Sequence, residues 1–305
     1  MPQKKAAGIW PPVATPFHAD LSVDFERHIG FCRSLLADGA HGLAVLGTNS
    51  EANSLDLGER EELVDRVVAA GIAPDKLMPG TGATSIGDAV RLTKHAVAHG
   101  VIGVLLLPPF YYKNVSDDGL FAFVSEVINR VGSSRLAIYL YHFPQLSGVP
   151  WPIPLVGRLL KAFPETVVGL KNSSGEVAYT ETLLKEYPDF VVFPGTEALL
   201  LNALRKDAAG VISGTANINT AALRRLYDGW RGPGAEALDQ TVTAVRRVVE
   251  QYPLIPAIKA ILADQFGAKE WLHIRPPLRP LDEQKRKELL GALAKLAAKE
   301  SVPAA

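Results

Sequence analysis

The sequence has a single cysteine, no long hydrophobic run and no net charge. With Cys32 alone, an intrachain disulfide framework and a cysteine-rich metal site are excluded, and a reducing cytoplasm is expected. No uncharged apolar stretch reaches the roughly 18 residues of a transmembrane helix, and the N-terminus has no secretory pattern, so we expect no membrane association. Lysine plus arginine equals aspartate plus glutamate at 32 each, a balance that predicts no nucleic-acid partner.

Short apolar runs alternate with helical patterns along most of the chain. The runs recur every roughly 20–35 residues, the length of a strand, a helix and two loops. Most are continuously apolar, as expected for strands that are covered on both faces. The expected strands are residues 8–14, 42–46, 77–80, 103–107, 136–141, 167–171, 191–194 and 210–212. The expected helices are residues 24–36, 59–70, 86–99, 117–131, 155–163, 179–187, 199–206 and 221–230.

Eight strands that are each followed by a helix predict an α/β protein with a (β/α)8 TIM barrel. We assign the barrel and its active site to residues 1–233. Residues 234–305 lack a strand pattern and are expected to form a C-terminal helical appendage of three helices, with a tail that frays. A doubly wound sheet would need a glycine-rich phosphate turn after the first strand, and residues 11–16 are not one.

Lys171 is the central candidate for chemistry. It ends the sixth apolar run, and in parallel α/β proteins the active site forms at that end of the strands. A lysine becomes a nucleophile when burial or a cationic neighbour depresses its pKa, and the neutral amine then attacks a ketone to form a Schiff base. The alternative is a lysine whose stem packs while its ammonium reaches water.

The ends of the second and sixth strands carry a Ser/Thr and a Glu at the spacing of a helix-capping box. Thr48 with Glu51 and Ser173 with Glu176 each predict the start of a helix. The turn at Thr48 also suits a carboxylate, because backbone N–H groups and a hydroxyl at a helix N-terminus bind anions. The two interpretations of that turn are compatible.

Tyrosines follow the fourth and fifth strands. Tyr111 and Tyr112 are adjacent on a loop, where packing or interface roles are usual. Tyr139 and Tyr141 share one face of the fifth strand, and Leu140 lies on the other. A phenol at a barrel mouth can donate and accept a proton, so Tyr141 is either a proton carrier or a cap on the core.

The histidines predict no metal site. His95 and His99 are four residues apart on an expected helix, but the sequence lacks the glutamate of a His-Glu-x-x-His motif and the helix is expected to face outward. His142 should point away from Tyr141 and is expected to be packed or hydrogen-bonded rather than a catalytic base.

Four of these junctions, taken in order, resemble the dihydrodipicolinate synthase/N-acetylneuraminate lyase superfamily over about residues 8–295. The resemblance implies a class I aldolase, a lyase without metal or cofactor. It implies that Lys171 forms a Schiff base with pyruvate or another 2-keto acid, that Tyr141 shuttles protons, and that Thr48 holds the carboxylate. The matching motifs are Gly47-Thr48-x-x-Glu51, Tyr111-Tyr112, Tyr141-x-x-Pro144 and Gly169-Leu170-Lys171.

The resemblance also implies an oligomer. Tyr112 corresponds to the tyrosine that this superfamily inserts across a dimer interface, with Tyr111 as the choice if the register is one residue off. We therefore expect a homo-oligomer, a dimer of dimers.

Departures from the superfamily pattern leave the substrate open. Dihydrodipicolinate synthases carry an arginine where this chain has Leu146, which cannot bind a carboxylate in a bidentate manner. N-acetylneuraminate lyases carry two adjacent acids where this chain has Glu197 and Ala198. We predict a 2-keto-3-deoxy sugar acid or an aromatic hydratase-aldolase substrate, with dihydrodipicolinate synthase and a silent ligand-binding homologue as alternatives. The expected substrate-binding residues are Asn49, Ser173, Gly195, Glu197, Ile212 and Leu146.

Overall fold

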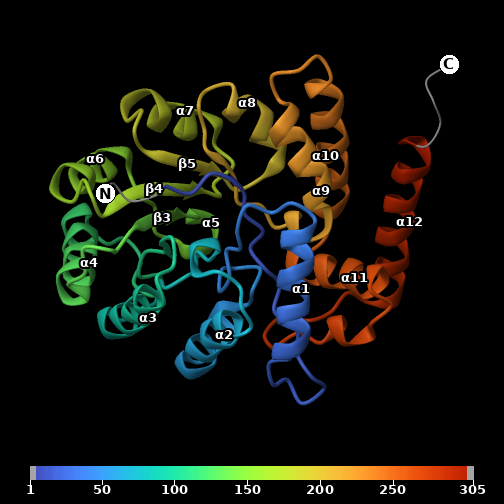
Figure 1. Ribbon diagram of the computed structural model, residues 1–305, viewed down its shortest axis with the longest axis horizontal. Coiled ribbons are helices and arrows are strands. Elements are labelled where there is room, and N and C mark those ends of the chain that lie inside the picture. The colour runs from blue at the N-terminus through green and yellow to red at the C-terminus, as the bar shows by residue number, and fades with distance from the viewer. Residues whose placement is uncertain (1–4, 301–305) are drawn as a thin grey trace.

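The structure, a computed structural model, describes residues 5–300 as a ring of short parallel strands surrounded by helices (Figure 1). The strands are β1 (Gly8–Ile9), β2 (Val104–Leu106), β3 (Ile138–His142), β4 (Val167–Asn172), β5 (Val191–Pro194) and β6 (Gly210–Val211). The helices of the barrel are α1 (Phe25–Ala37), α2 (Leu57–Ala69), α3 (Ile86–His99), α4 (Asp117–Val131), α5 (Pro144–Ser147), α6 (Ile153–Ala162), α7 (Val177–Glu186), α8 (Leu200–Leu204) and α9 (Ala216–Gly229). Short 3-10 turns are η1 (Ala52–Ser54), η2 (Pro74–Lys76), η3 (Glu197–Leu199) and η4 (Lys269–Leu272).

The ring is closed by eight extended segments, although two of them are too short to count as strands. Strands β2 to β5 form one parallel sheet in chain order, and β1 pairs with β6. Segments 42–46 and 77–80 join the ring through isolated parallel bridges between Leu43 and Leu77 and between Gly80 and Leu105. Backbone hydrogen bonds complete the circuit, with Ala44 N donating to Pro11 O, Met78 N to Leu43 O and Ala209 N to Val192 O. The predicted (β/α)8 barrel is therefore confirmed.

The first expected strand is shorter than the sequence suggested. Residues 8–14 were expected as one strand, but β1 ends at Ile9. Pro11 and Pro12 have no N–H to donate to a neighbouring strand, so a regular ladder cannot pass through them. Pro79 limits the third segment in the same way.

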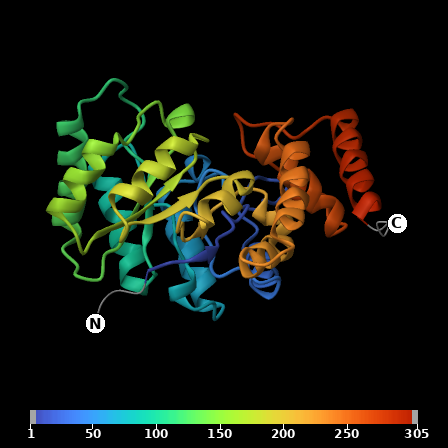
Figure 2. The ribbon, with the colours of Figure 1, turned by 90° about the horizontal axis from the view of Figure 1, so that it is seen from above.

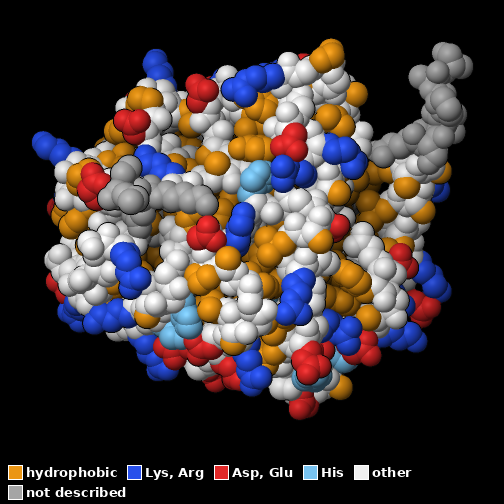
Figure 3. Space-filling model, in the orientation of Figure 1, with side chains coloured by type: hydrophobic (Ala, Val, Ile, Leu, Met, Phe, Trp, Pro, Cys, Tyr) orange, Lys and Arg blue, Asp and Glu red, His pale blue; other side chains and the backbone are white. Residues whose placement is uncertain are grey.

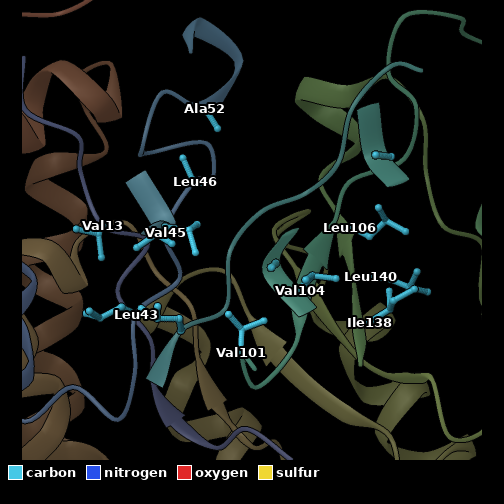
Figure 4. Packing of buried hydrophobic residues seen from close by; sticks show 14 of the residues in the cluster. Val13, Leu43, Val45, Leu46, Ala52, Val101, Val104, Leu106, Ile138 and Leu140 are labelled. Atoms are coloured by element: carbon cyan, nitrogen blue, oxygen red, sulfur yellow. The ribbon is translucent and has the colours of Figure 1, made fainter. Parts of the chain in front are cut away.

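Side chains alternate between the inside of the barrel and the layer beneath the helices. Leu105, Tyr139 and Phe193 belong to an inner cluster, whereas the flanking residues of β2 and β3 pack beneath the helices. Figure 4 shows that outer layer, with Val104 and Leu106 beside Ile138 and Leu140. Because β-strand side chains alternate, Tyr139 and Tyr141 face inward together and Leu140 faces outward, as predicted.

Both capping-box predictions are wrong. At residue 51 the backbone is left-handed, with φ of 54°, and the helix starts later with Leu57, capped reciprocally by Asp56 and Glu59. Helix α7 begins after Glu176 with no side-chain cap. There the amide of Asn172 orders the turn, because it accepts from Ser174 N at 2.9 Å and donates to the carbonyl of Glu176 at 3.2 Å.

Three helices follow the barrel, as predicted: α10 (Ala235–Val249), α11 (Leu254–Gln265) and α12 (Glu283–Glu300). Figure 2 shows them gathered at one side of the barrel. Helix α10 packs against α8, α9 and η3, and Trp271 of η4 packs edge-on against Phe31 of α1 with ring centres 4.9 Å apart. The C-terminal helices thus pack directly against the barrel. The expected tail lies outside residues 5–300, and among these residues no helix combines the length and apolar character needed to cross a membrane.

Candidate active site

A cavity of about 530 Å³ opens at the C-terminal ends of the strands, where sequence analysis placed the site. One wall comes from the barrel and the other from the C-terminal helices. The barrel contributes Thr48, Asn49, Tyr141, Phe143, Leu146, Lys171, Ser173, Ser174, Gly175, Gly195, Thr196, Ile212 and Gly214. The opposite wall consists of Arg246, Glu250, Pro253, Leu254, Ile255, Pro256 and Leu278.

Lys171 and Tyr141 are neighbours in register on β4 and β3, and both line this cavity. The Lys171 amine lies 4.2 Å from the centre of the Tyr141 ring, and Lys171 is only 2% exposed. Among the residues that the structure describes, no carboxylate lies within salt-bridge distance of Lys171. The amine is therefore held by the strand and the phenol ring, not by a counter-ion.

Thr48 joins the pair through its hydroxyl, which lies 3.1 Å from the phenol oxygen of Tyr141. Either oxygen can donate in this contact, so the two hydroxyls form a chain along which a proton can move. The structure thus brings together three of the four residues predicted to be catalytic. They converge because parallel strands end at a common rim, although residues 48, 141 and 171 are remote in sequence.

The turn around Thr48 is rigid yet leaves donors free. Ser50 Oγ donates to Val13 O at 2.5 Å and accepts from Gly47 N at 3.2 Å, while Thr15 Oγ1 donates to Ser50 O at 2.7 Å. Within residues 5–300, the backbone N–H groups of Thr48 and Asn49 have no hydrogen-bond acceptor, and Asn49 Oδ1 is buried without a partner. Fixed, unengaged donors beside a hydroxyl are suited to an anion such as a carboxylate.

Five of the six residues predicted to bind substrate line the cavity: Asn49, Leu146, Ser173, Gly195 and Ile212. Gly195 allows a close approach of two strands, because a β-carbon there would stand 2.3 Å from Ser173 Oγ. Glu197 is not at the cavity. It is fully buried, and its carboxylate accepts hydrogen bonds from the hydroxyls of Ser213 and Thr215.

Comparison with known proteins identifies the family of this chain. A model of the Dihydrodipicolinate synthetase family matches residues 5–296. The chain belongs to this family. It is 31% identical over 293 residues to an "Uncharacterized DapA-like lyase" of Chloroflexus aurantiacus, covering 95% of this chain and 97% of the relative.

Solved structures of the family superpose over nearly the whole chain. A dihydrodipicolinate synthase from Agrobacterium tumefaciens C58 has a TM-score of 0.89 at 34% identity, covering 95% of this chain and 99% of the other. YagE of Escherichia coli K12 was solved in complex with pyruvate. It has a TM-score of 0.87 at 27% identity, and the match covers 95% of this chain and 98% of YagE. The curated name of YagE is putative 2-dehydro-3-deoxy-D-gluconate aldolase.

Tyr112 lies outside the cavity of this dihydrodipicolinate synthetase family chain. Tyr111 and Tyr112 are 74% and 73% exposed, and their rings touch edge to face with centres 5.3 Å apart. Lys113 links their loop to α5, the short helix after β3, by donating to Ser147 O at 2.6 Å. Lys113 therefore holds the loop in place, while the two tyrosine rings next to it point into solvent.

Arg246 of α10 and Glu250, which caps the C-terminus of that helix, are cavity residues that sequence reasoning missed. Arg246 Nε donates to Glu250 Oε2 at 3.1 Å, and Arg246 Nη1 is enclosed without a hydrogen-bond partner. Asp239 Oδ1 and Thr243 Oγ1, on the same side of α10 at helical spacing, are enclosed and unpartnered as well. In the sequence, Arg246 and Glu250 are simply opposite charges four residues apart, a spacing that is common on the solvent-exposed surface of helices and does not indicate a site.

His142 is a packing residue, as predicted. It faces away from the cavity, its Nδ1 accepts from Trp151 N at 3.0 Å, and its ring stacks on Tyr179 at 4.2 Å. Burial lowers the pKa of His142 to about 4, so the ring is neutral at physiological pH. On the inward face, burial raises the pKa of Tyr139 to about 12, and its hydroxyl accepts from Ala6 N at 2.8 Å.

A second buried lysine lies behind the Thr48 turn. Lys259 of α11 forms an ion pair with Glu51 and donates to His273 O at 2.9 Å, and its amine lies 4.3 Å from the centre of the Phe17 ring. Glu51 also accepts from Arg275 N at 3.1 Å. Burial is the main cause that lowers the pKa of Lys259, to about 8, opposed by Glu51. The pair ties the C-terminal helices to the turn that carries Thr48.

Proposed function

We propose that this chain is a class I lyase that forms a Schiff base between Lys171 and a 2-keto acid and cleaves it to pyruvate. The observation that carries the proposal is the Lys171 amine, buried at the cavity beside Tyr141 with no described carboxylate in reach. No ion pair has to be broken before such an amine reacts. A buried lysine kept only for stability would be expected to have a carboxylate partner.

The first half of the reaction is imine formation. The Lys171 amine attacks the keto carbon, and the carbinolamine loses water once its hydroxyl has been protonated. Tyr141 is the proton carrier, and Thr48 connects the phenol to the rest of the site. The substrate carboxylate would lie on the Thr48–Asn49 turn, whose free N–H groups support this assignment.

The second half breaks the C3–C4 bond. Tyr141 removes the proton of the C4 hydroxyl, the bond electrons move into the iminium, and an aldehyde and a pyruvate enamine result. Protonation at C3 and hydrolysis of the imine release pyruvate and restore the lysine. In reverse, the pyruvate enamine adds to an aldehyde and forms the C3–C4 bond. Loss of water would instead start from the uncleaved iminium, which gives up a C3 proton and then expels the protonated C4 hydroxyl.

We propose a 2-keto-3-deoxy sugar acid as the substrate. The cavity wall formed by the C-terminal helices carries the Arg246–Glu250 pair, next to apolar side chains such as Leu254. Arg246 can donate hydrogen bonds to the hydroxyl groups of a sugar acid, and Glu250 can accept hydrogen bonds from them. The likeness to YagE supports pyruvate as the common product.

Dihydrodipicolinate synthase is the second candidate, favoured by the 34% identity to the Agrobacterium structure. Leu146 argues against it, because its side chain supplies no cation for the carboxylate of aspartate semialdehyde. A kinetic panel of 2-keto-3-deoxygluconate, N-acetylneuraminate, aspartate semialdehyde and an aromatic aldehyde with pyruvate, read by pyruvate release or uptake, separates these activities. No turnover with any of them would favour a silent binding homologue.

Assembly as a dimer of dimers is part of the proposal. The exposed Tyr112 would then enter a neighbouring subunit and extend the Tyr141–Thr48 chain. A fully active monomer in light scattering would contradict this role, as would unchanged turnover in Tyr112→Phe. The reducing cytoplasm inferred from the single cysteine stays a prediction.

The mechanism is tested by trapping the imine. Sodium borohydride with pyruvate should add one reduced pyruvate to the intact protein, and peptide mapping should place it on Lys171. The matched control is Lys185→Met, a substitution on the outer helix α7, which should still be labelled. An unlabelled wild-type protein would refute the Schiff base, and a label on another lysine would refute the assignment of Lys171.

A further inference from the structure

A side-chain cluster outside the cavity unites two helices of the barrel. His95 and His99 lie on α3, and Asp65 lies on α2. Each histidine Nε2 is 2.7 Å from the same carboxylate oxygen, Asp65 Oδ1. The imidazole rings stand 4.9 Å apart at 70° to each other. Three potential metal ligands therefore converge on one point, although the sequence of α3 by itself shows only two.

We propose that Asp65, His95 and His99 form a binding site for a divalent transition-metal ion of the zinc type. The potential ligand atoms all lie within 4.8 Å of one another. Two imidazole nitrogens and one carboxylate oxygen form a common donor set for zinc, with water as the fourth ligand. Calcium and magnesium prefer oxygen ligands, so imidazole donors select against them.

Side-chain movements alone would let the three residues hold an ion. Ligand atoms 2.0–2.1 Å from a tetrahedral zinc stand about 3.3 Å apart. The two 2.7 Å contacts to Asp65 would therefore open by a fraction of an ångström, and the two histidine nitrogens, which lie within 4.8 Å of each other, would move closer together. The side chains can make this shift, because Asp65 is 53% exposed and the two histidines are partly exposed.

The surrounding charges do not oppose a cation. Arg91, one turn before His95 on α3, is held by both carboxylate oxygens of Glu61, and Arg66 is held by Glu62. The adjoining arginines are thus already neutralised by acids of α2. Figure 3 shows histidine side chains at the surface in the region of α2 and α3, with acidic side chains beside them.

The ion would act on the fold, not on the reaction. None of the three residues lines the cavity that holds Lys171. Without a metal, the same atoms are joined by hydrogen bonds from two imidazoles to one carboxylate. A metal in their place would link α2 to α3 more strongly and stabilise the folded chain by mass action. This inference does not depend on the proposed function.

The test is zinc titration of the untagged, chelator-treated, full-length protein against a chromophoric zinc chelator, followed by thermal unfolding with and without zinc. We expect one zinc ion per chain and a higher melting temperature. His99→Asn and Asp65→Asn should each weaken binding roughly tenfold or more and abolish the thermal shift. His18→Asn, at an exposed histidine elsewhere on the chain, should bind as the wild type does.

Two outcomes would overturn the site. One is the absence of stoichiometric zinc binding to the wild-type protein. The other is binding that neither His99→Asn nor Asp65→Asn weakens, because the ion would then lie elsewhere. Melting curves without zinc verify that each variant is folded, so that lost binding reports on the ligands themselves.

Discussion

Lys171 and Lys259 are both almost fully buried, at 2% and 0% exposure, yet their surroundings are opposite. Lys259 has a complete set of partners in Glu51, a backbone carbonyl and an aromatic ring. Lys171 has an aromatic ring on one side and an open cavity on the other. A buried amine with a counter-ion is explained by the fold, whereas one that lines a cavity without a counter-ion is available to a ligand.

The two lysines are also connected. Glu51, the partner of Lys259, ends the same turn that presents Thr48 and Asn49 to the cavity. Lys259 therefore supports the position of the turn that we propose as the carboxylate site beside Lys171. This is why the C-terminal helices, which supply Lys259, belong to the active site as well as to the outer layer.

The largest expected effect is at Lys171. Lys171→Met should reduce turnover to background, a loss of more than about a thousandfold, because no nucleophile remains. The unfolding free energy should stay within about 1 kcal/mol of the wild-type value or rise, because no ion pair is lost. Steady-state kinetics and urea unfolding check the two expectations. A large loss of unfolding free energy would show that Lys171, like Lys259, is needed for stability.

Lys259→Met should give the reverse pattern. It leaves Glu51 buried without its cation, and the expected cost is about 3–5 kcal/mol of unfolding free energy. The folded fraction should still form the borohydride-trapped adduct on Lys171. Urea unfolding at one pH measures the first effect, and mass spectrometry measures the second.

The double variant Lys259→Met with Glu51→Gln is the matched control. It removes both charges and should recover much of the lost stability, because no unpaired buried ion remains. An equal loss in the single and double variants would mean that the packing of the lysine stem, not its charge, supports the turn.

The smallest expected effect concerns His142, a buried base that shares β3 with Tyr141. Its pKa is lowered to about 4 in the folded protein, against about 6.5 when unfolded, so below pH 6.5 the unfolded chain binds more protons. Stability should therefore fall as the pH drops from about 6.5 to 4, by at most about 1.4 kcal/mol per pH unit from this group. His142→Asn keeps an acceptor for Trp151 N and should reduce that slope, while buried His28, whose pKa is also lowered to about 4, maintains the rest. An unchanged slope would exclude His142 as its source.

The sequence by itself determined the barrel and the centre of the site. Apolar runs at regular spacing require burial on both faces, and parallel strands of a barrel end at one rim. Those two rules place the junctions that carry Thr48, Tyr141 and Lys171 at one rim of the barrel, and the family resemblance groups the three residues in one site. Strand position also suggested Ser173, Gly195 and Ile212, whereas the family resemblance suggested Asn49 and Leu146. All five line the cavity, and their roles in binding stay predictions.

Only the tertiary structure decided the partners that come from elements remote in sequence. Glu51 satisfies the spacing of a capping box, yet a buried ion pair with Lys259 of α11 outweighs that local preference. Arg246 reaches the cavity only because α10 packs beside the barrel mouth, and Asp65 meets His95 and His99 only across two helices. Local patterns report what a segment prefers, whereas the packing of whole elements decides which charged groups share a site.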